Sequence, residues 1–116
     1  MFETGPNVQR VIEESVPGKQ LTIAHVIASP VSELYENLGL AHGGAIGILT
    51  LSPYETAMIA ADYAVKTANV EIGFLDRFTG SVVVTGDVGS VETALNRVSE
   101  MLKHKLGFIV TAITRT

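Results

Sequence analysis

The sequence predicts a single α+β domain, with an antiparallel sheet that carries helices on one face in the unit from Ala45 onward. Apolar, β-branched runs alternate with helical patterns, and glycine or proline signals separate them. From Ala45 onward the order is strand, helix, strand, strand, helix, strand, which is typical of two-layer α+β folds. A further strand and helix over residues 21–38 come before this unit. With 116 residues, the chain has the length of one domain.

The first 16 residues are predicted to form an arm outside the domain proper, which covers residues 17–116. Gly5-Pro6-Asn7 is a turn signal, and the apolar residues after it are scattered among polar ones, as in a loose arm or a short strand. The sequence Val16-Pro17-Gly18-Lys19 predicts a turn, because proline presets φ at the second position and glycine tolerates a positive φ at the third.

The front unit is predicted to be a buried strand followed by a short helix. The run from Leu21 to Ala28 is apolar on both parities, so we expect a strand that is covered on both faces. Ser29 is expected to cap the helix, with Pro30 at its first position and Gly39 at its end. The helix has one apolar stripe, formed by Val31, Leu34, Tyr35 and Leu38 at helical spacing.

A second buried strand and a longer helix come next. The run AIGILTL at residues 45–51 predicts the strand. Ser52 and Glu55 have the spacing of a capping box, so we expect a helix from Pro53 to about Thr67. Small residues recur along it and permit close packing, at Ala57, Ala60, Ala61, Ala64 and Ala68.

The last third of the chain predicts a hairpin, a long helix and a final strand. Strands over residues 70–78 and 81–86 are joined through Thr79-Gly80. Apolar residues at helical spacing predict a helix over 88–106, which carries cations near its end and is capped by Gly107. Residues 108–116 are expected to form the final strand.

The composition limits the classes of function. Charged residues make up 17% of the chain, below the roughly 25% of typical soluble domains, so part of the surface is expected to be reserved for protein contacts. The absence of cysteine excludes thiolate catalysis, iron–sulfur clusters and cysteine-based zinc sites. A net charge of -4 gives no electrostatic source for broad binding to nucleic acid or anionic membranes. With no bilayer-spanning run and no signal-peptide pattern, a cytoplasmic protein is expected.

The histidines do not predict a metal or catalytic site. They lack metal-ligand spacing, and they are His25, His42 and His104. His25 is interpreted as a hydrogen-bonded core or interface residue, and His104 as a solvated residue at a helix end. The segment His42-Gly43-Gly44 resembles a glycine-rich oxyanion segment, but no nucleophile elbow accompanies it.

The remaining polar residues give no catalytic centre either. Ser90 follows a glycine-containing segment at a helix start, where serine usually caps the helix. Asp76-Arg77 lies at the predicted hairpin tip, a common place for functional residues, and is interpreted first as an ion pair or turn. No phosphate-cradling motif stands between a strand and a helix, so no cofactor is predicted.

Several segments together resemble a known family, the bacterial microcompartment (BMC) shell domain. The segments that carry the resemblance are AIGILTL at 45–51, ADYAVKTANV at 61–70 and TGDVGSV at 85–91. Further segments narrow it to the circularly permuted subfamily of propanediol-utilisation U and ethanolamine-utilisation S type: VPGKQ at 16–20, LTIAHVIASP at 21–30, GFLDRFTG at 73–80 and ITRT at the end. The permutation explains the front unit, which resembles the strand and helix that ordinary members carry at their C-terminus.

The resemblance implies a structural shell protein that has no catalytic activity and no cofactor. It implies a cyclic hexamer that tiles edge to edge into the polyhedral shell around an enzyme core in the cytoplasm. The implied partners are further copies and other shell proteins, with encapsulated enzymes as additional candidates and without nucleic acid, membrane or metal. Propanediol, ethanolamine and choline systems all stay open as the pathway served.

The resemblance also implies roles for particular residues. Lys66 matches the lysine that ordinary members lay against its copy in the neighbouring hexamer, and Asn69 follows it in the same motif. In permuted relatives the N-terminal arm forms a short β-barrel with its symmetry mates and caps the central pore. That role falls here on Val8, Val11, Ile12, Glu14 and Val16. The hairpin DRFTG is tighter than the pore loop of ordinary members, so no pore-lining role is carried over to it.

Two other classes of protein share the predicted element order. Ferredoxin-like regulatory domains bind small molecules between subunits and usually form dimers or trimers. Acylphosphatase-like hydrolases need a phosphate-cradling loop with a nearby arginine and asparagine, and neither the Gly43-Gly44 loop nor the Asp76-Arg77 turn supplies that set. The native mass separates the shell protein from the regulatory domain.

Overall fold

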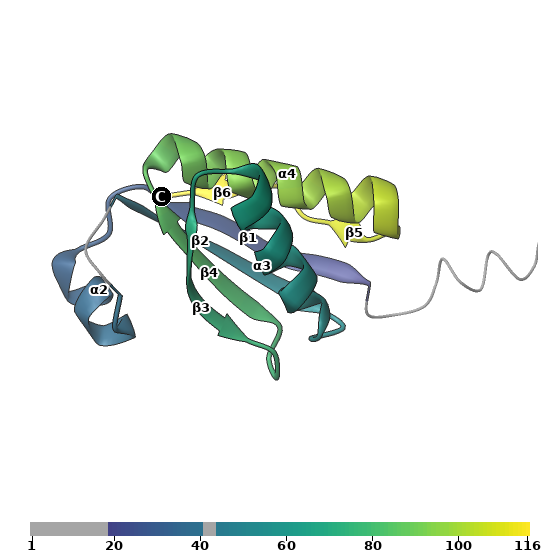
Figure 1. Cartoon of the computed structure of the whole chain (residues 1–116), viewed down its shortest axis with the longest axis horizontal. Coiled ribbons are helices and arrows are strands. Elements are labelled where there is room, and N and C mark those ends of the chain that lie inside the picture. The colour runs from purple at the N-terminus through teal and green to yellow at the C-terminus, as the bar shows by residue number, and fades with distance from the viewer. Residues whose placement is uncertain (1–18, 41–43) are drawn as a thin grey trace, which may run out of the picture.

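The computed structural model describes residues 19–40 and 44–116, which fold into one twisted sheet with helices on it (Figure 1). The strands are β1 (Gln20–Ile27), β2 (Ala45–Ser52), β3 (Glu71–Asp76), β4 (Ser81–Gly86), β5 (Ile109–Val110) and β6 (Thr114–Arg115). The helices are α2 (Ser32–Leu38), α3 (Thr56–Thr67) and α4 (Val88–Leu106). From β2 onward, this order confirms the predicted succession of strands and helices.

The sheet has the order β3-β4-β2-β1-β5, and β6 also pairs with β1. Its four long strands are antiparallel, as predicted, whereas β5 and β6 both run parallel to β1. The final strand predicted for 108–116 is therefore two short strands, and both run parallel to their neighbour β1 instead of antiparallel to it. The reason is topological: α4 is a crossover that returns the chain along the sheet, so the chain re-enters in the direction of β4 and β1.

The two helices of the unit that begins at Ala45 share one face of the sheet, as predicted, and the helix of the front unit packs on the other face. Helices α3 and α4 lie side by side on one face, and α2 lies at one end of the molecule (Figure 1). Tyr35 of α2 packs with Ile46 and Val83 in a small second cluster, separate from the main core. Its hydroxyl donates a hydrogen bond to the carbonyl of Gly44.

The main core lies between the sheet and the pair α3 and α4. The alanines predicted to allow close packing are buried along α3, and they are Ala57, Ala60, Ala61 and Ala64. Gly47 of β2 shows how closely α4 approaches, because a Cβ there would lie 2.7 Å from Val91 Cγ1 and 2.8 Å from Leu95 Cδ1. Leu95 is fully buried. Burial of a side chain of this size stabilises a fold by about 1.5–3 kcal/mol.

A bulge in β1 changes which residues face the core. The register with β2 shifts between Leu21 and Ile23, so Leu21, Ala24 and Val26 are all buried under the helices. Ile23 lies on the other face and is 48% exposed. The expectation that β1 is covered on both faces is therefore wrong, because no helix covers that part of the second face within the described chain.

The helix starts differ from the predicted ones in α2 and α3. Helix α2 begins at Ser32 after Val31, which makes no side-chain cap, so Ser29 does not cap it and Pro30 precedes the helix. Ser52 is the last residue of β2 and pairs with Gln20, so it is not available as a helix cap. The predicted capping box with Glu55 does not form, because the chain turns first and α3 starts at Thr56.

Helix α4 confirms its predicted limits and shows how its start is capped. Asp87 is the N-cap, and its Oδ1 accepts the backbone N–H of Ser90 at 2.9 Å. The Ser90 hydroxyl donates to Asp87 Oδ2 at 2.8 Å, so Ser90 supports the cap from inside the helix and is not itself the cap residue. Gly39 and Gly107 end α2 and α4 in the left-handed conformation, as predicted.

Candidate assembly surfaces

The end of α3 carries the two residues assigned to lateral contacts. Lys66 lies in the last turn of α3, and its Nζ is 2.8 Å from Asp62 Oδ2 one turn earlier. Both side chains are well exposed, at 69% and 59%, so this pair alone contributes little to stability. Asn69 is exposed in the short link between α3 and β3. The structure thus brings Lys66 and Asn69 to the same exposed end of the helix.

A tight hairpin joins β3 to β4. Gly80 has a φ of 78°, and a Cβ there would lie 2.1 Å from the carbonyl oxygen of Leu51, which glycine alone avoids. The Gly80 carbonyl accepts the N–H of Leu51 at 2.8 Å, which fastens the turn to β2. Thr79 and Gly80 connect the two strands, as predicted. The turn is longer than expected, because it also includes Arg77 and Phe78.

Asp76 organises this turn. Its Oδ1 accepts the backbone N–H of Phe78 at 2.8 Å. That bond, followed by the hydroxyl of Thr79, holds the pKa of Asp76 below its ordinary value. Arg77 lies over the Phe78 ring, with 4.9 Å from its guanidinium carbon to the ring centroid. The predicted turn role of Asp76 is confirmed, whereas Arg77 contacts the aromatic ring.

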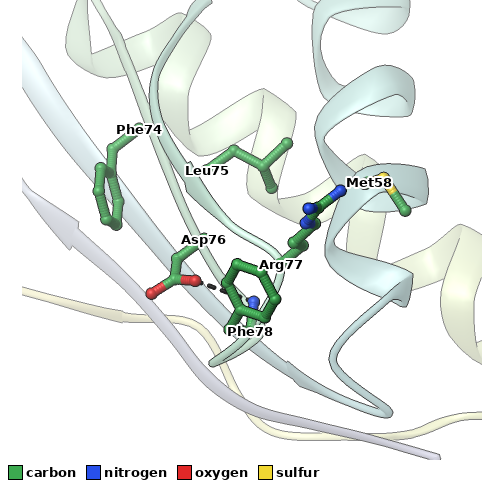
Figure 2. Close-up of a pocket in the computed structure, with 6 residues that line it drawn as sticks. All are labelled: Met58, Phe74, Leu75, Asp76, Arg77 and Phe78. Carbon is green, nitrogen blue, oxygen red and sulfur yellow. Dashed lines mark hydrogen bonds between the residues drawn. The ribbon is translucent and has the colours of Figure 1, made fainter.

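A mostly apolar pocket of about 430 Å³ lies at the hairpin tip. It is lined by Met58 of α3 and by Phe74, Leu75, Asp76, Arg77 and Phe78 of the hairpin. Figure 2 shows Phe74 on the far side of the strand from Met58, while Arg77 extends toward Met58. The side chain of Phe78 is 74% exposed, so its ring is available for contact with another molecule.

The pocket continues an apolar edge of the molecule. Strand β3 ends the strand order, so one side of its backbone has no neighbouring strand in the described chain. Large apolar side chains are exposed along it and on the adjacent flank of α3: Met58, Val65, Ile72, Phe74, Leu75 and Phe78. We call this set the β3 edge. Edge strands with exposed apolar residues are sites of pairing or packing with another chain.

Sequence reasoning missed the β3 edge because it singled out the polar pair Asp76-Arg77. The available signal was the run of apolar residues at the β3 positions, since a strand with one solvated face normally alternates apolar and polar residues. Because the run was interpreted as an ordinary hairpin strand, its side chains were not expected on the surface.

His25 ties β1 to the last strand. Its Nδ1 is 2.6 Å from Thr114 Oγ1 and its Nε2 is 2.8 Å from Thr116 Oγ1. This confirms the prediction of a hydrogen-bonded histidine. His104 is exposed near the end of α4, as predicted.

Metal sites and membrane-spanning helices were sought among the described residues. Within 19–40 and 44–116, no three histidine, cysteine or acidic side chains form a group able to hold a metal ion. No helix in this part of the chain is long and apolar enough to cross a membrane. The arm residues Val8, Val11, Ile12, Glu14 and Val16 lie outside the described residues, as do His42 and the first three residues of the turn predicted at 16–19.

Comparison with known proteins identifies the family. Residues 45–114 match the family model of the BMC domain. The chain is 53% identical over 116 residues to the bacterial microcompartment shell protein CutR of Streptococcus intermedius, with 100% of both chains covered. It is 53% identical over 116 residues to the shell protein PduU of Salmonella typhimurium, covering 99% of this chain and 100% of the relative. For the shell protein EutS of the same organism, identity is 52% over 110 residues, with 95% and 99% covered.

Solved structures agree with these sequence matches. A structure described as a flat hexamer of CutR has a TM-score of 0.84 and 55% identity, covering 88% of this chain and 94% of that chain. A structure described as a CutR screw with a 41.9 Å pitch has a TM-score of 0.82 and 54% identity, covering 86% and 100%.

The fold and these matches define a shell-type protein of α+β architecture, and the chain belongs to the BMC domain family. Within that family its relatives are of the circularly permuted PduU and EutS type. The family match begins at β2, so β1 and α2 lie in front of it, which is consistent with that permutation.

Proposed function

We propose that this protein is a structural shell subunit of a bacterial microcompartment that assembles as a ring of six copies. The observation that carries the proposal is the match to the flat CutR hexamer over 88% of the chain. The uncovered β3 edge supports it, because a ring in which each copy packs its β3 edge against a different surface of the next copy buries these side chains six times. The regulatory-domain alternative, which predicts dimers or trimers, is not favoured.

Rings of this kind build a shell by meeting at their outer edges. We propose Lys66 and Asn69 for that contact, on the basis of their place in the KTANV segment and their joint exposure at the end of α3. The Asp62 carboxylate beside Lys66 reduces the repulsion between two such lysines when two rings approach.

The N-terminal arm, residues 1–16, is proposed to cap the centre of the ring. The support comes from the family resemblance alone, since these residues lie outside the described part of the chain. Removal of residues 1–16 is expected to leave the ring intact and to open its centre in averaged electron micrographs. A centre that stays closed contradicts the assignment.

The proposed role is scaffolding, without catalysis by this chain. The relatives named above are shell proteins, and the polar side chains of the described sites serve turns, caps and strand pairing. Other shell proteins and encapsulated enzymes are the proposed partners, and the shell of a cytoplasmic compartment is the proposed location. Turnover that depends on a particular side chain contradicts this assignment.

Native mass and electron microscopy test the function. A mass of six subunits, with flat sheets, tubes or closed shells at high concentration, supports it, whereas a dispersed dimer or trimer contradicts it. Lys66→Ala is expected to keep the mass of six and to lose the sheets. The matched control is Lys103→Ala, which removes the same charge from an exposed position on α4.

A further inference from the structure

We infer that Arg97, on α4, is a positioning residue for the tiling edge: it fixes the end of α3 and with it the placement of Lys66 and Asn69. The inference rests on the proposed function, because it concerns the contact proposed for these two residues.

The end of α3 lacks the closure that the other two helices have. Gly39 and Gly107 end α2 and α4 in the left-handed conformation, and their backbone N–H groups return to carbonyls of the last turn. Ala68 ends α3 in an extended conformation, with φ of -145° and ψ of 161°. Its N–H reaches the carbonyl of Ala64 alone, so later carbonyls of the helix need other donors.

Arg97 supplies such a donor from the neighbouring helix. Its guanidinium donates a hydrogen bond to the carbonyl of Thr67, the last residue of α3. A cation at a helix C-terminus also interacts favourably with the helix dipole, and hydrogen bonds from charged donors are stronger than neutral ones. The Thr67 hydroxyl donates to the carbonyl of Tyr63 at 2.8 Å, so the last residue of α3 is also tied back to its own helix.

A second element holds the other end of the same link. A Cβ on Gly86, the last residue of β4, would lie 3.1 Å from the carbonyl oxygen of Asn69 and 3.3 Å from Val70 Cγ1. Val70 is buried, with 8% of its surface exposed. The link from Thr67 to Val70 is therefore fixed by Arg97 at its start and by the close approach of Gly86 at its end.

This double fixation matters for a contact between rings. Lys66 immediately precedes Thr67, and Asn69 lies between the two fixed points. Association loses affinity when an interface segment has to be ordered as it binds, so a link that is already fixed favours tiling. The ordering cost is incurred at each edge contact of a ring, so a fixed link lowers it at every edge.

The test compares sheet formation by full-length variants that keep the ring. Arg97→Ala is expected to leave the mass of six unchanged and to raise the protein concentration needed for sheets several-fold. Arg97→Lys keeps a cationic donor and is expected to restore assembly, and Lys103→Ala is the charge control on the same helix. Hydrogen exchange at the amides of residues 68–70 is expected to be faster in Arg97→Ala. Gly86→Ala, which displaces Asn69 from the other side, is expected to weaken sheets in the same way.

The outcomes separate this inference from the proposed function. If Lys66→Ala loses sheets while Arg97→Ala and wild type assemble alike, the contact proposed for Lys66 and Asn69 is supported and the role of Arg97 is overturned. Loss of the ring itself in Arg97→Ala also overturns it, because Arg97 then serves the fold or the ring contact. If both Lys66→Ala and Arg97→Ala form normal sheets, the edge assignment fails first and the role of Arg97 fails with it.

Discussion

Arg115 of β6 pairs with Glu92 of α4, with 2.6 Å between Nη1 and Oε2. The contact joins the last strand to the helix that crosses over it, and it acts together with the hydrogen bonds between His25 and the threonines of the same segment. Two residues of strand pairing alone would hold this segment weakly, so side chains fasten it from both the sheet and the helix.

The pair itself is expected to stabilise the protein only slightly. The two side chains are 54% and 36% exposed, and pairs of this kind contribute about 0.2–1 kcal/mol. Arg115→Ala, Glu92→Ala and the double variant, measured by denaturant unfolding, give the coupling energy directly. A coupling well above this range would show that the pair is shielded by the assembly.

The cap of α4 is expected to make stability depend on pH at the acid end. The backbone N–H and hydroxyl of Ser90 hold the pKa of Asp87 below its ordinary value of 3.8. Because the folded-state pKa is lowered, the contribution is complete above the unfolded pKa and is lost as the pH falls through the folded pKa. Asp87→Ala is therefore expected to melt at a lower temperature than wild type at pH 7, by a margin that shrinks at low pH. Asp87→Asn, which caps without titrating, is the control for the pH effect.

The core under α4 is expected to be sensitive to truncation. Leu95 is fully buried against Gly47, so Leu95→Ala removes contacts and leaves a cavity, at a cost of about 2–5 kcal/mol. Leu38→Ala, at a side chain 43% exposed on α2, is the matched control and is expected to change the free energy of unfolding by less than about 1 kcal/mol. Equal losses in the two variants would contradict the placement of the core.

The hairpin turn is expected to require glycine at position 80. Gly80→Ala places a methyl group against the Leu51 carbonyl in a backbone region that costs other residues about 1–2 kcal/mol even without a clash. A lower free energy of unfolding is expected, by more than that amount. Gly89→Ala is the control, because a Cβ at Gly89 meets only Asp87 Oδ1, at 3.4 Å. Unchanged stability in Gly80→Ala would show that the turn adopts another conformation.

The β3 edge is expected to matter for assembly more than for folding. Phe78 is 74% exposed, so Phe78→Ser should change the stability of the single chain by less than about 0.5 kcal/mol. In the proposed ring the same change removes an apolar contact from each interface, so the mass of six should give way to smaller species on dilution. Phe78→Leu, which stays apolar, should retain the ring. A ring that tolerates serine places Phe78 outside the subunit contact.

The parts of the fold that sequence predicted are those set by local residues. Gly39 and Gly107 end their helices as expected, since a left-handed cap is a property of glycine itself. The same local reasoning failed at Ser52 because pairing of β2 with β1 extends to that residue and removes it from the helix. Propensity and spacing do not report how far a neighbouring strand reaches.

The direction of the last strand and the edge of the molecule are properties of the whole chain. Nothing in residues 108–116 states that they run parallel to β1, because the direction follows from the crossover by α4. For the candidate sites, Lys66 and Asn69 were assigned by resemblance, and the structure shows that both are exposed at the same end of α3. Arg97 was not found, because its partner is a backbone carbonyl thirty residues away in the chain.

At the bulge in β1, Thr22 is an extra residue with no partner of its own in β2, and it shifts the alternation of side chains between the two faces by one position. Its hydroxyl donates to the carbonyl of Thr50 at 3.2 Å, so the extra residue is held against β2. Without this residue, Leu21 and Ile23 would be consecutive and would lie opposite Leu51 and Thr50, which are themselves consecutive. Regular alternation would then keep Leu21 in the core and leave His25 on the face where it meets both threonines. Deletion of Thr22 is therefore expected to remove the bulge and straighten β1 without exchanging its two faces.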